Sequence, residues 1–341
     1  MIQARLVHWL SVFAAVILLA LFLHAVDHPY QYFRAGNPND VQTKAQAGFA
    51  LMGGGDDLDE AFRWMCERAG GGDFVVLRAS GDEDYNPYIQ GLCKLNSVAT
   101  IILKSRDAAN DPFVVEAIRH AEAVFIAGGD QAHYINWWMG TPLQQALNEA
   151  IERGVPIGGT SAGLAVQGEF VYSAQGDAPD DKDLSSEQTL VNPYHPRVTI
   201  VRAFLKNPLL KNVITDTHFA ARDRMGRTLV FMARILEDGR TAEIRDIAVD
   251  ERTSVLLAQD GQAVVVGAGR AYFLQSAQRP EVCKAGAPLT FRGITARSLA
   301  AGEHFDVGRW SSSDGTVYTL AVEKGVVRSS LPHGGAYTKV E

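Results

Sequence analysis

Short apolar runs alternate with longer amphipathic stretches through the first two thirds of the chain, and this alternation constrains the fold most. The apolar runs have the length of buried strands and occupy residues 49–52, 74–79, 98–103, 123–127, 155–159 and 213–216. Between and after them, apolar residues recur three and four positions apart over residues 58–68, 112–121, 134–153 and 222–236, as in helices that cover a sheet. This order predicts an α/β fold with a doubly wound, mainly parallel sheet.

The pattern changes after residue 246. Short β-prone runs separated by Asp260-Gly261 and Gly267 then follow each other directly, at residues 247–251, 253–258, 263–268 and 271–275. They predict antiparallel strands that close an edge of the same sheet. We therefore expect an α/β domain over residues 46–280 and an antiparallel, β-rich C-terminal extension over residues 281–341.

The first 26 residues predict a membrane-directed segment. No formally charged side chain occurs from Leu6 to Val26, and Arg5 precedes this run. Its length lies between that of a cleaved signal peptide and that of a retained anchor, and both readings stay open. Arg5 would keep the N-terminus cytoplasmic, so the rest of the chain is expected to be exported, to the periplasm or the extracellular space. The polar residues 27–45 are interpreted as a linker.

Charge and cysteine content narrow the function. The chain has 32 Lys and Arg against 39 Asp and Glu, a formal net charge of −7, which argues against a partner with a phosphate backbone such as nucleic acid. The three cysteines are Cys66, Cys93 and Cys283, without C-x-x-C spacing for a metal or redox centre. A Cys66–Cys93 bridge stays open for an exported protein. We expect no metal and no cofactor.

Ser161 stands in a G-x-S-x-G motif, Gly159 to Gly163, between an apolar strand and a helix-like stretch. This is the context of a nucleophile elbow, where a strained turn exposes the serine at the carboxyl edge of a sheet. The amide of Ala162 would then stabilise an oxyanion. A glycine-rich turn that binds phosphate or permits close packing is the alternative.

A second strand end carries Gly128, Gly129, Asp130 and Gln131. Ligands of open parallel sheets bind at such ends. The amide of Gly129 is expected to complete the oxyanion hole, and Gln131 to bind a substrate amide or carboxylate. The alternative is a tight turn in which Asp130 caps a helix.

The third strand end is followed by His218, which we expect within reach of Ser161 as its general base. Arg222, Arg224 and Arg227 follow, and guanidinium groups suit carboxylate recognition, although a solvated helix face is the commoner role of such a charge run. Asp216 precedes the histidine and is the carboxylate nearest to it in sequence.

Together these motifs resemble the serine peptidases that include cyanophycinase and aspartyl dipeptidase. The resemblance rests on GGDQ at Gly128–Gln131, GGTSAG at Gly158–Gly163 and D-x-H-F-x-x-R-x-R-x-G-R at Asp216–Arg227, within residues 46–260. It implies a sheet of the glutamine-amidotransferase, flavodoxin-like type, and cleavage beside aspartyl residues. It also implies Ser161 as nucleophile and His218 as base, with a substrate site formed by Gln131, Asp216, Arg222, Arg224 and Arg227. Cyanophycinase releases β-aspartyl-arginine dipeptides from cyanophycin, a polymer with an aspartate backbone.

Two departures from the family pattern affect the assignment of these roles to residues of this chain. Thr217 stands where related sequences usually have Gln, and a polar, acidic insertion occupies residues 176–187. The insertion lies where the resemblance places the acidic residue that completes a catalytic triad with Ser161 and His218. Glu187 is the first choice for it, Asp177 the second, and Asp216 or Glu251 follow. The insertion's aspartates, Asp177, Asp180, Asp181 and Asp183, are either carboxylates for substrate guanidinium groups or part of a solvated loop.

The sequence therefore predicts a serine-type exopeptidase whose partner is a peptide or cyanophycin. The alternatives are an exported α/β-hydrolase-type esterase and a non-catalytic peptide-binding protein on the same fold. An esterase usually has an HGG motif before its serine, whereas His333-Gly334-Gly335 follows Ser161. Membrane contact is expected only through the N-terminal segment, and a homodimer stays open.

Overall fold

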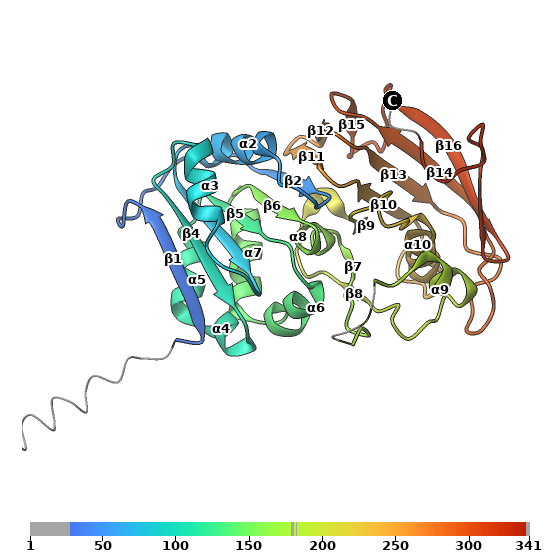
Figure 1. Cartoon of the computed structure of the whole chain (residues 1–341), viewed down its shortest axis with the longest axis horizontal. Helices are drawn as coiled ribbons and strands as arrows, with labels where there is room; N and C mark the ends of the chain where they lie inside the picture. The colour runs from blue at the N-terminus through green and yellow to red at the C-terminus, as the bar shows by residue number, and fades with distance from the viewer. Residues whose placement is uncertain (1–27, 179–180, 182, 339–341) are drawn as a thin grey trace, which may run out of the picture.

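The chain forms two mixed β-sheets that lie side by side (Figure 1). The structure is a computed structural model that describes residues 28–178, 181 and 183–338. Within these ranges the first sheet has the strand order β1-β4-β3-β5-β6-β2-β11-β12-β15, and the second has the order β17-β16-β14-β13-β10-β9-β7-β8.

The centre of the first sheet is parallel and confirms the five strands predicted up to residue 160. These strands are β2 Gly48–Met52, β3 Asp73–Arg78, β4 Ser97–Leu103, β5 Ala123–Ile126 and β6 Ile157–Thr160. Nearly all their residues are buried because helices cover both faces. One face packs on α4 Arg106–Asn110, α5 Pro112–Arg119 and α7 Pro142–Glu152, and the other on α2 Asp59–Ala69 and α3 Tyr85–Leu92.

The predicted linker 27–45 is wrong over residues 30–36. These residues form β1 (Tyr30–Gly36), which pairs antiparallel with β4. β1 is an edge strand that is only half buried, so it lacks a clear apolar alternation. Its Arg34 contacts Asp73 on β3 at 3.1 Å.

The single helix expected over residues 134–153 is divided. A short helix α6 (Gln131–His133) continues into a π-helix, η1 (Tyr134–Trp138), and α7 begins only at Pro142. Gly140 has a φ of +72°, and the Thr141 side chain caps α7 by accepting a hydrogen bond from the backbone N–H of Gln144. Pro142 at the first helical position suits a helix start, so the break has local causes.

The sequence predicts that the antiparallel strands close an edge of the first sheet, but the strands are divided between the two sheets. β11 Thr253–Ala258, β12 Gln262–Gly267 and β15 His304–Asp306 extend the first sheet beyond β2. β10 Ile244–Val249 and β13 Ala271–Ser276 belong to the second sheet, together with the predicted strand β9 Val213–Asp216. The chain therefore passes from one sheet to the other between Val249 and Thr253.

The rest of the second sheet comes from two separate parts of the chain. β7 Phe170–Tyr172 and β8 Ile200–Arg202 lie at one end, and β14 Phe291–Leu299, β16 Thr316–Glu323 and β17 Val326–Ser329 at the other. α9 Ser186–Val191 and α10 Met225–Glu237 pack on this sheet, and a 3-10 turn at Pro208–Leu210 precedes β9. β13 pairs with β14, so the sheet continues across residue 280 without a break.

Cys66 and Cys93 form a disulfide, with their Cα atoms 6.2 Å apart. It joins α2 to the end of α3, and Cys283 is a buried free thiol. No helix among the described residues is long and apolar enough to cross a membrane. The predicted segment 1–26 lies outside the described residues.

Candidate active site

Ser161 lies on a strained turn between β6 and the short helix α8 (Ala162–Ala165), as the motif predicts. Its φ of 52° is in the left-handed region that non-glycine residues rarely adopt. A Cβ at Gly159 would overlap the Gly163 carbonyl, and one at Gly163 would overlap the Ile126 carbonyl. The motif therefore needs glycine at both places. The helix is shorter than expected, since β7 already begins at Phe170.

His218 follows β9 of the second sheet and contacts Ser161 of the first. The Ser161 Oγ lies 2.7 Å from the His218 Nε2. His218 has a φ of 46°, and its backbone N–H donates to the Gly53 carbonyl at 2.8 Å. A Cβ at Gly54 would collide with the imidazole, so the glycines that follow β2 make room for this ring. The site lies at the junction of the two sheets, not along the rim of one.

The carboxylate beside the histidine belongs to Glu251, whose Oε1 lies 2.6 Å from the His218 Nδ1. The first choice, Glu187, is therefore corrected: it is exposed in the first turn of α9. The second choice, Asp177, contacts Arg197 and the Tyr172 hydroxyl instead.

The position of Glu251 follows from strand register. β9 and β10 are parallel neighbours, and Asp216 pairs with Ala248. His218 and Glu251 therefore come two and three residues after paired positions, at the same end of both strands. Two adjacent strands that end near a histidine and a carboxylate were the signal that could have identified Glu251.

Electrostatics favour a neutral imidazole at this position. Burial lowers the pKa of His218, and the hydrogen bond to Glu251 opposes this effect. The same hydrogen bond lowers the pKa of Glu251. A neutral His218 can accept the Ser161 proton at Nε2 while its Nδ1–H donates to Glu251.

The GGDQ segment borders Ser161. A Cβ at Gly128 would lie 3.5 Å from the Ser161 Cβ, and Gly129 has a φ of 148°, which favours glycine. Asp130 caps α6, since its Oδ1 accepts from the Ala132 N–H at 2.8 Å. Gln131 lies in the cavity described next, and its Nε2 donates to the Tyr172 carbonyl at 3.5 Å.

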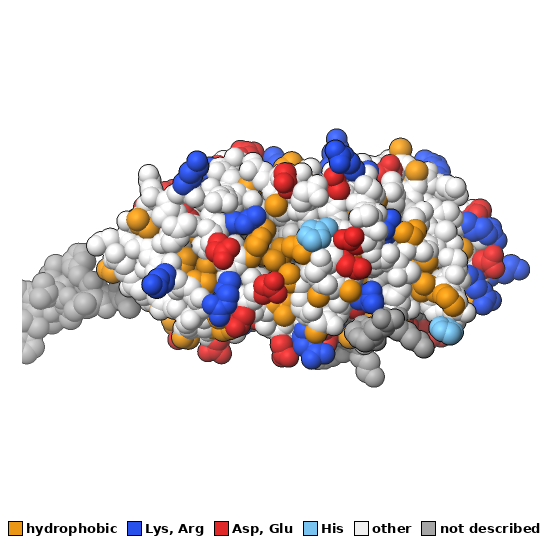
Figure 2. All heavy atoms as spheres, turned by 90° about the horizontal axis from the view of Figure 1, so that it is seen from above, with side chains coloured by type: hydrophobic (Ala, Val, Ile, Leu, Met, Phe, Trp, Pro, Cys, Tyr) orange, Lys and Arg blue, Asp and Glu red, His pale blue; other side chains and the backbone are white. Residues whose placement is uncertain are grey.

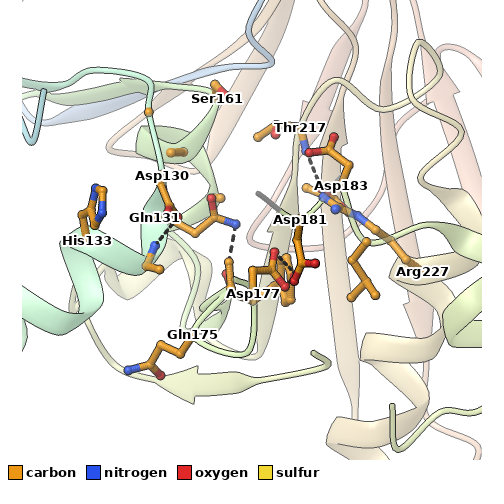
Figure 3. Close-up of a pocket in the computed structure, with 18 of the residues that line it drawn as sticks. Asp130, Gln131, His133, Ser161, Gln175, Asp177, Asp181, Asp183, Thr217 and Arg227 are labelled. Atoms are coloured by element: carbon orange, nitrogen blue, oxygen red, sulfur yellow. Dashed lines mark hydrogen bonds and ion pairs between the residues drawn. The ribbon is translucent and has the colours of Figure 1, made fainter. Parts of the chain in front are cut away.

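A cavity of about 460 Å³ extends from Ser161 between the two sheets. Figure 3 shows Ser161 at one end of it, with Gln131 on one side and Arg227 on the other. Its lining includes all the predicted substrate-binding residues: Gln131, Asp216, Arg222, Arg224 and Arg227. It also includes Asp177, Asp181 and Asp183 of the acidic insertion.

Asp216 and Arg227 form a buried ion pair rather than two free substrate contacts. The Arg227 Nε donates to the Asp216 Oδ2 at 2.9 Å, and the Thr228 hydroxyl donates to the same oxygen at 2.8 Å. Burial raises the pKa of Asp216, but the guanidinium groups of Arg227 and Arg224 outweigh it and hold this pKa below its ordinary value. Asp216 therefore fixes Arg227 in the wall of the cavity.

The other two arginines share Asp183. Its Oδ2 accepts from Arg222 at 2.8 Å and from Arg224 at 2.6 Å. Arg224 also donates to the carbonyl and the hydroxyl oxygen of Thr217, each at 3.0 Å. Thr217, which replaces the usual Gln of the family, thus helps to position Arg224.

The charges over the rest of the surface are mixed. On the face shown in Figure 2, lysine and arginine side chains are interspersed with aspartate and glutamate. Within the described ranges, no cluster of three His, Cys, Asp or Glu side chains is arranged to hold a metal ion.

Comparison with known proteins agrees with a peptidase, as the fold and the site suggest. Residues 51–191 match the family model described as Peptidase family S51. The resemblance drawn from the motifs is thereby confirmed: the chain is similar to the peptidase family that includes cyanophycinase and aspartyl dipeptidase.

The chain is also similar to curated cyanophycinases. It is 26% identical over 214 residues to the cyanophycinase of Nostoc sp., which covers 61% of this chain and 64% of the relative. It is 26% identical over 216 residues to the cyanophycinase of Geminocystis herdmanii, covering 60% of this chain and 70% of the relative. The match thus spans less than two thirds of the Nostoc protein.

One solved structure shares the mixed α/β fold. A peptidase from an acI-B1 Actinobacterium superposes with a TM-score of 0.50 at 18% sequence identity. The alignment covers 78% of this chain and 98% of that structure.

Proposed function

We propose that this chain is a serine peptidase that cleaves aspartyl peptide bonds at Ser161, with cyanophycin as its substrate and β-aspartyl-arginine dipeptides as products. The observation that carries this proposal is the hydrogen-bonded series Ser161, His218 and Glu251, of which Ser161 lines the cavity. The similarity to cyanophycinases supports the choice of substrate.

The mechanism uses groups of the chain itself. As the Ser161 Oγ attacks the scissile carbonyl carbon, its proton passes to the His218 Nε2, and Glu251 stabilises the imidazolium. The amides of Gly129 and Ala162 bind the resulting oxyanion. When the tetrahedral intermediate collapses, His218 gives the proton to the leaving amine. It then takes a proton from the water that hydrolyses the acyl-enzyme, which releases the acid and restores the Ser161 hydroxyl.

Chain order favours a peptidase over an α/β-hydrolase esterase. In α/β-hydrolases the acidic residue precedes the histidine in sequence, after the serine. Here the order is Ser161, His218, Glu251. Fold similarity alone would not separate these classes.

The test is to incubate the purified protein with cyanophycin, a β-aspartyl dipeptide and a simple ester, and to identify the products. We expect β-aspartyl-arginine from cyanophycin, and Ser161→Ala should lower this turnover at least about a thousandfold without a change in thermal unfolding. Binding of cyanophycin without turnover would instead indicate a binding protein. Turnover of the ester alone would indicate an esterase.

The same proposal includes export of the chain. The Cys66–Cys93 disulfide supports it, because disulfides persist mainly in oxidising compartments outside the cytoplasm. Cell fractionation of the full chain, with the disulfide state measured by thiol labelling, tests this part separately.

A further inference from the structure

Tyr134 is a buried residue that the mechanism above does not use. It opens the π-helix η1, has no exposed surface, and stacks on Trp138 with the ring centroids 4.3 Å apart. π-Helical turns occur often at functional sites. Burial raises its pKa strongly, so the hydroxyl stays protonated and acts as a donor.

The Tyr134 hydroxyl contacts two consecutive carbonyl groups of the GGDQ segment. It lies 2.8 Å from the Ala127 oxygen and 3.0 Å from the Gly128 oxygen. These carbonyls lie between the end of β5 and Gly129. One side chain in the core thus restrains the loop that borders Ser161.

This contact bears directly on the Gly129 amide. The Gly128 carbonyl and the Gly129 N–H belong to one planar trans peptide, in which the two groups point in opposite directions. When the tyrosine hydroxyl fixes the carbonyl, it also fixes the direction of the N–H.

Tyr134 does not line the cavity. Gly129 and Ser161 line the cavity, whereas Tyr134 packs within the core of the first sheet. The Gly129 N–H points away from the Tyr134 hydroxyl, and Gly129 borders the same cavity as Ser161, on which an oxyanion would form.

We propose that Tyr134 is a positioning residue, whose hydroxyl orients the Gly128–Gly129 peptide so that the Gly129 N–H stabilises the oxyanion. This inference rests on the proposed peptidase function. Without the hydroxyl, this peptide can rotate, and the donor loses its preorganised direction at the moment when charge develops.

The test uses Tyr134→Phe, which removes only the hydroxyl and keeps the ring and its stacking. We expect kcat to fall by about 10- to 100-fold, somewhat less than the loss of a whole oxyanion donor, while KM stays nearly unchanged. Tyr318→Phe is the matched control. It removes another buried hydroxyl that donates to a backbone carbonyl, that of Ala336 at 3.2 Å, in the second sheet.

A second measurement separates positioning from general loss of structure. A substrate-like peptide aldehyde forms a tetrahedral adduct with a serine nucleophile, whereas the corresponding alcohol cannot. Tyr134→Phe should lower the affinity for the aldehyde by about the same factor as kcat and leave the affinity for the alcohol unchanged.

Three results would overturn the inference: an unchanged kcat in Tyr134→Phe, equal weakening of aldehyde and alcohol, or a loss in Tyr318→Phe as large as that in Tyr134→Phe. Failure of the peptidase proposal itself would look different. In that case Ser161→Ala would retain the activity of the unaltered chain, or the unaltered chain would bind the aldehyde no more tightly than the alcohol.

Discussion

Glu251 and His218 contact each other through a hydrogen bond of 2.6 Å, although 33 residues separate them in sequence. The contact exists because β9 and β10 are adjacent parallel strands that end at the same level. Glu251 lies in the turn through which the chain then leaves the second sheet for the first. The carboxylate is thus positioned by the junction of the two sheets.

Replacing Glu251 by Gln should lower kcat by about 100- to 10,000-fold with little change in KM. A glutamine can hold the imidazole in the wrong tautomer and cannot stabilise its charged form. Glu187→Gln is the matched control, since Glu187 is exposed on α9, and it should retain nearly full activity. A larger loss in Glu187→Gln than in Glu251→Gln would refute this assignment.

The pH dependence of kcat/KM should report His218. Its pKa is lowered, chiefly by burial, so the neutral form that accepts a proton persists below pH 6.5. Activity is therefore expected to rise with pH, with a midpoint below 6.5, and to level off near neutrality.

Two substitutions should move this midpoint in opposite directions. Glu251 raises the pKa of His218, so Glu251→Gln should shift the midpoint to lower pH. Arg222 lowers this pKa, so Arg222→Gln should shift the midpoint to higher pH. Shifts in the same direction, or none, measured from the acidic limb of kcat/KM, would speak against His218 as the titrating group.

The parallel strands, Ser161 and His218 could be predicted from sequence because each depends on a local pattern. Apolar runs of strand length identify β2 to β6, and the glycines around Ser161 mark a turn that only glycine permits. Strand ends that carry polar residues predicted the meeting of Ser161 and His218, which lie 2.7 Å apart.

The remaining features depend on pairing between distant segments. β1 is half buried and polar, so its sequence does not differ clearly from that of a linker. β10 and β11 look alike in sequence, yet one joins each sheet, because strand partners are set by the whole fold. The sequence does not single out Glu251 for the same reason: its proximity to His218 arises from the register of β9 and β10.

Asp183 should influence which substrates the cavity accepts. Its carboxylate already occupies the space between the guanidinium groups of Arg222 and Arg224. Burial raises the pKa of Asp183, but the two arginines outweigh it and lower this pKa to about 2, so the carboxylate stays ionised. A free side-chain carboxylate on the substrate would compete with it, whereas an amidated one would not.

We therefore expect Asp183→Asn to increase the preference for an aspartyl peptide over its asparaginyl counterpart by about tenfold in kcat/KM, or about 1.4 kcal/mol. Asp181→Asn serves as control, because Asp181 lines the same cavity but lies 3.6 Å from Arg197. Equal changes for both peptides, or the same shift in both variants, would exclude this role.

Asp246 should make the stability of the fold depend on pH. It lies on β10 with Ile244 and Ala248 on the same face, is fully buried, and neither carboxylate oxygen has a hydrogen-bond partner. Burial raises its pKa well above the ordinary value, so the folded chain holds a proton that the unfolded chain releases above about pH 4. The contribution of Asp246 to the free energy of unfolding should therefore fall as pH rises above 4.

Asp246→Asn removes this titration. The variant should match the unaltered chain near pH 4 and exceed its stability increasingly toward pH 8, by about 1 to 3 kcal/mol. Asp250→Asn is the contrasting variant. Asp250 accepts hydrogen bonds from the Ala220 and Arg270 N–H groups at 2.9 and 3.1 Å, so this variant should be less stable than the unaltered chain at every pH. Denaturant unfolding at several pH values measures both. A stability difference for Asp246→Asn that does not change with pH would show that this carboxyl does not titrate as described.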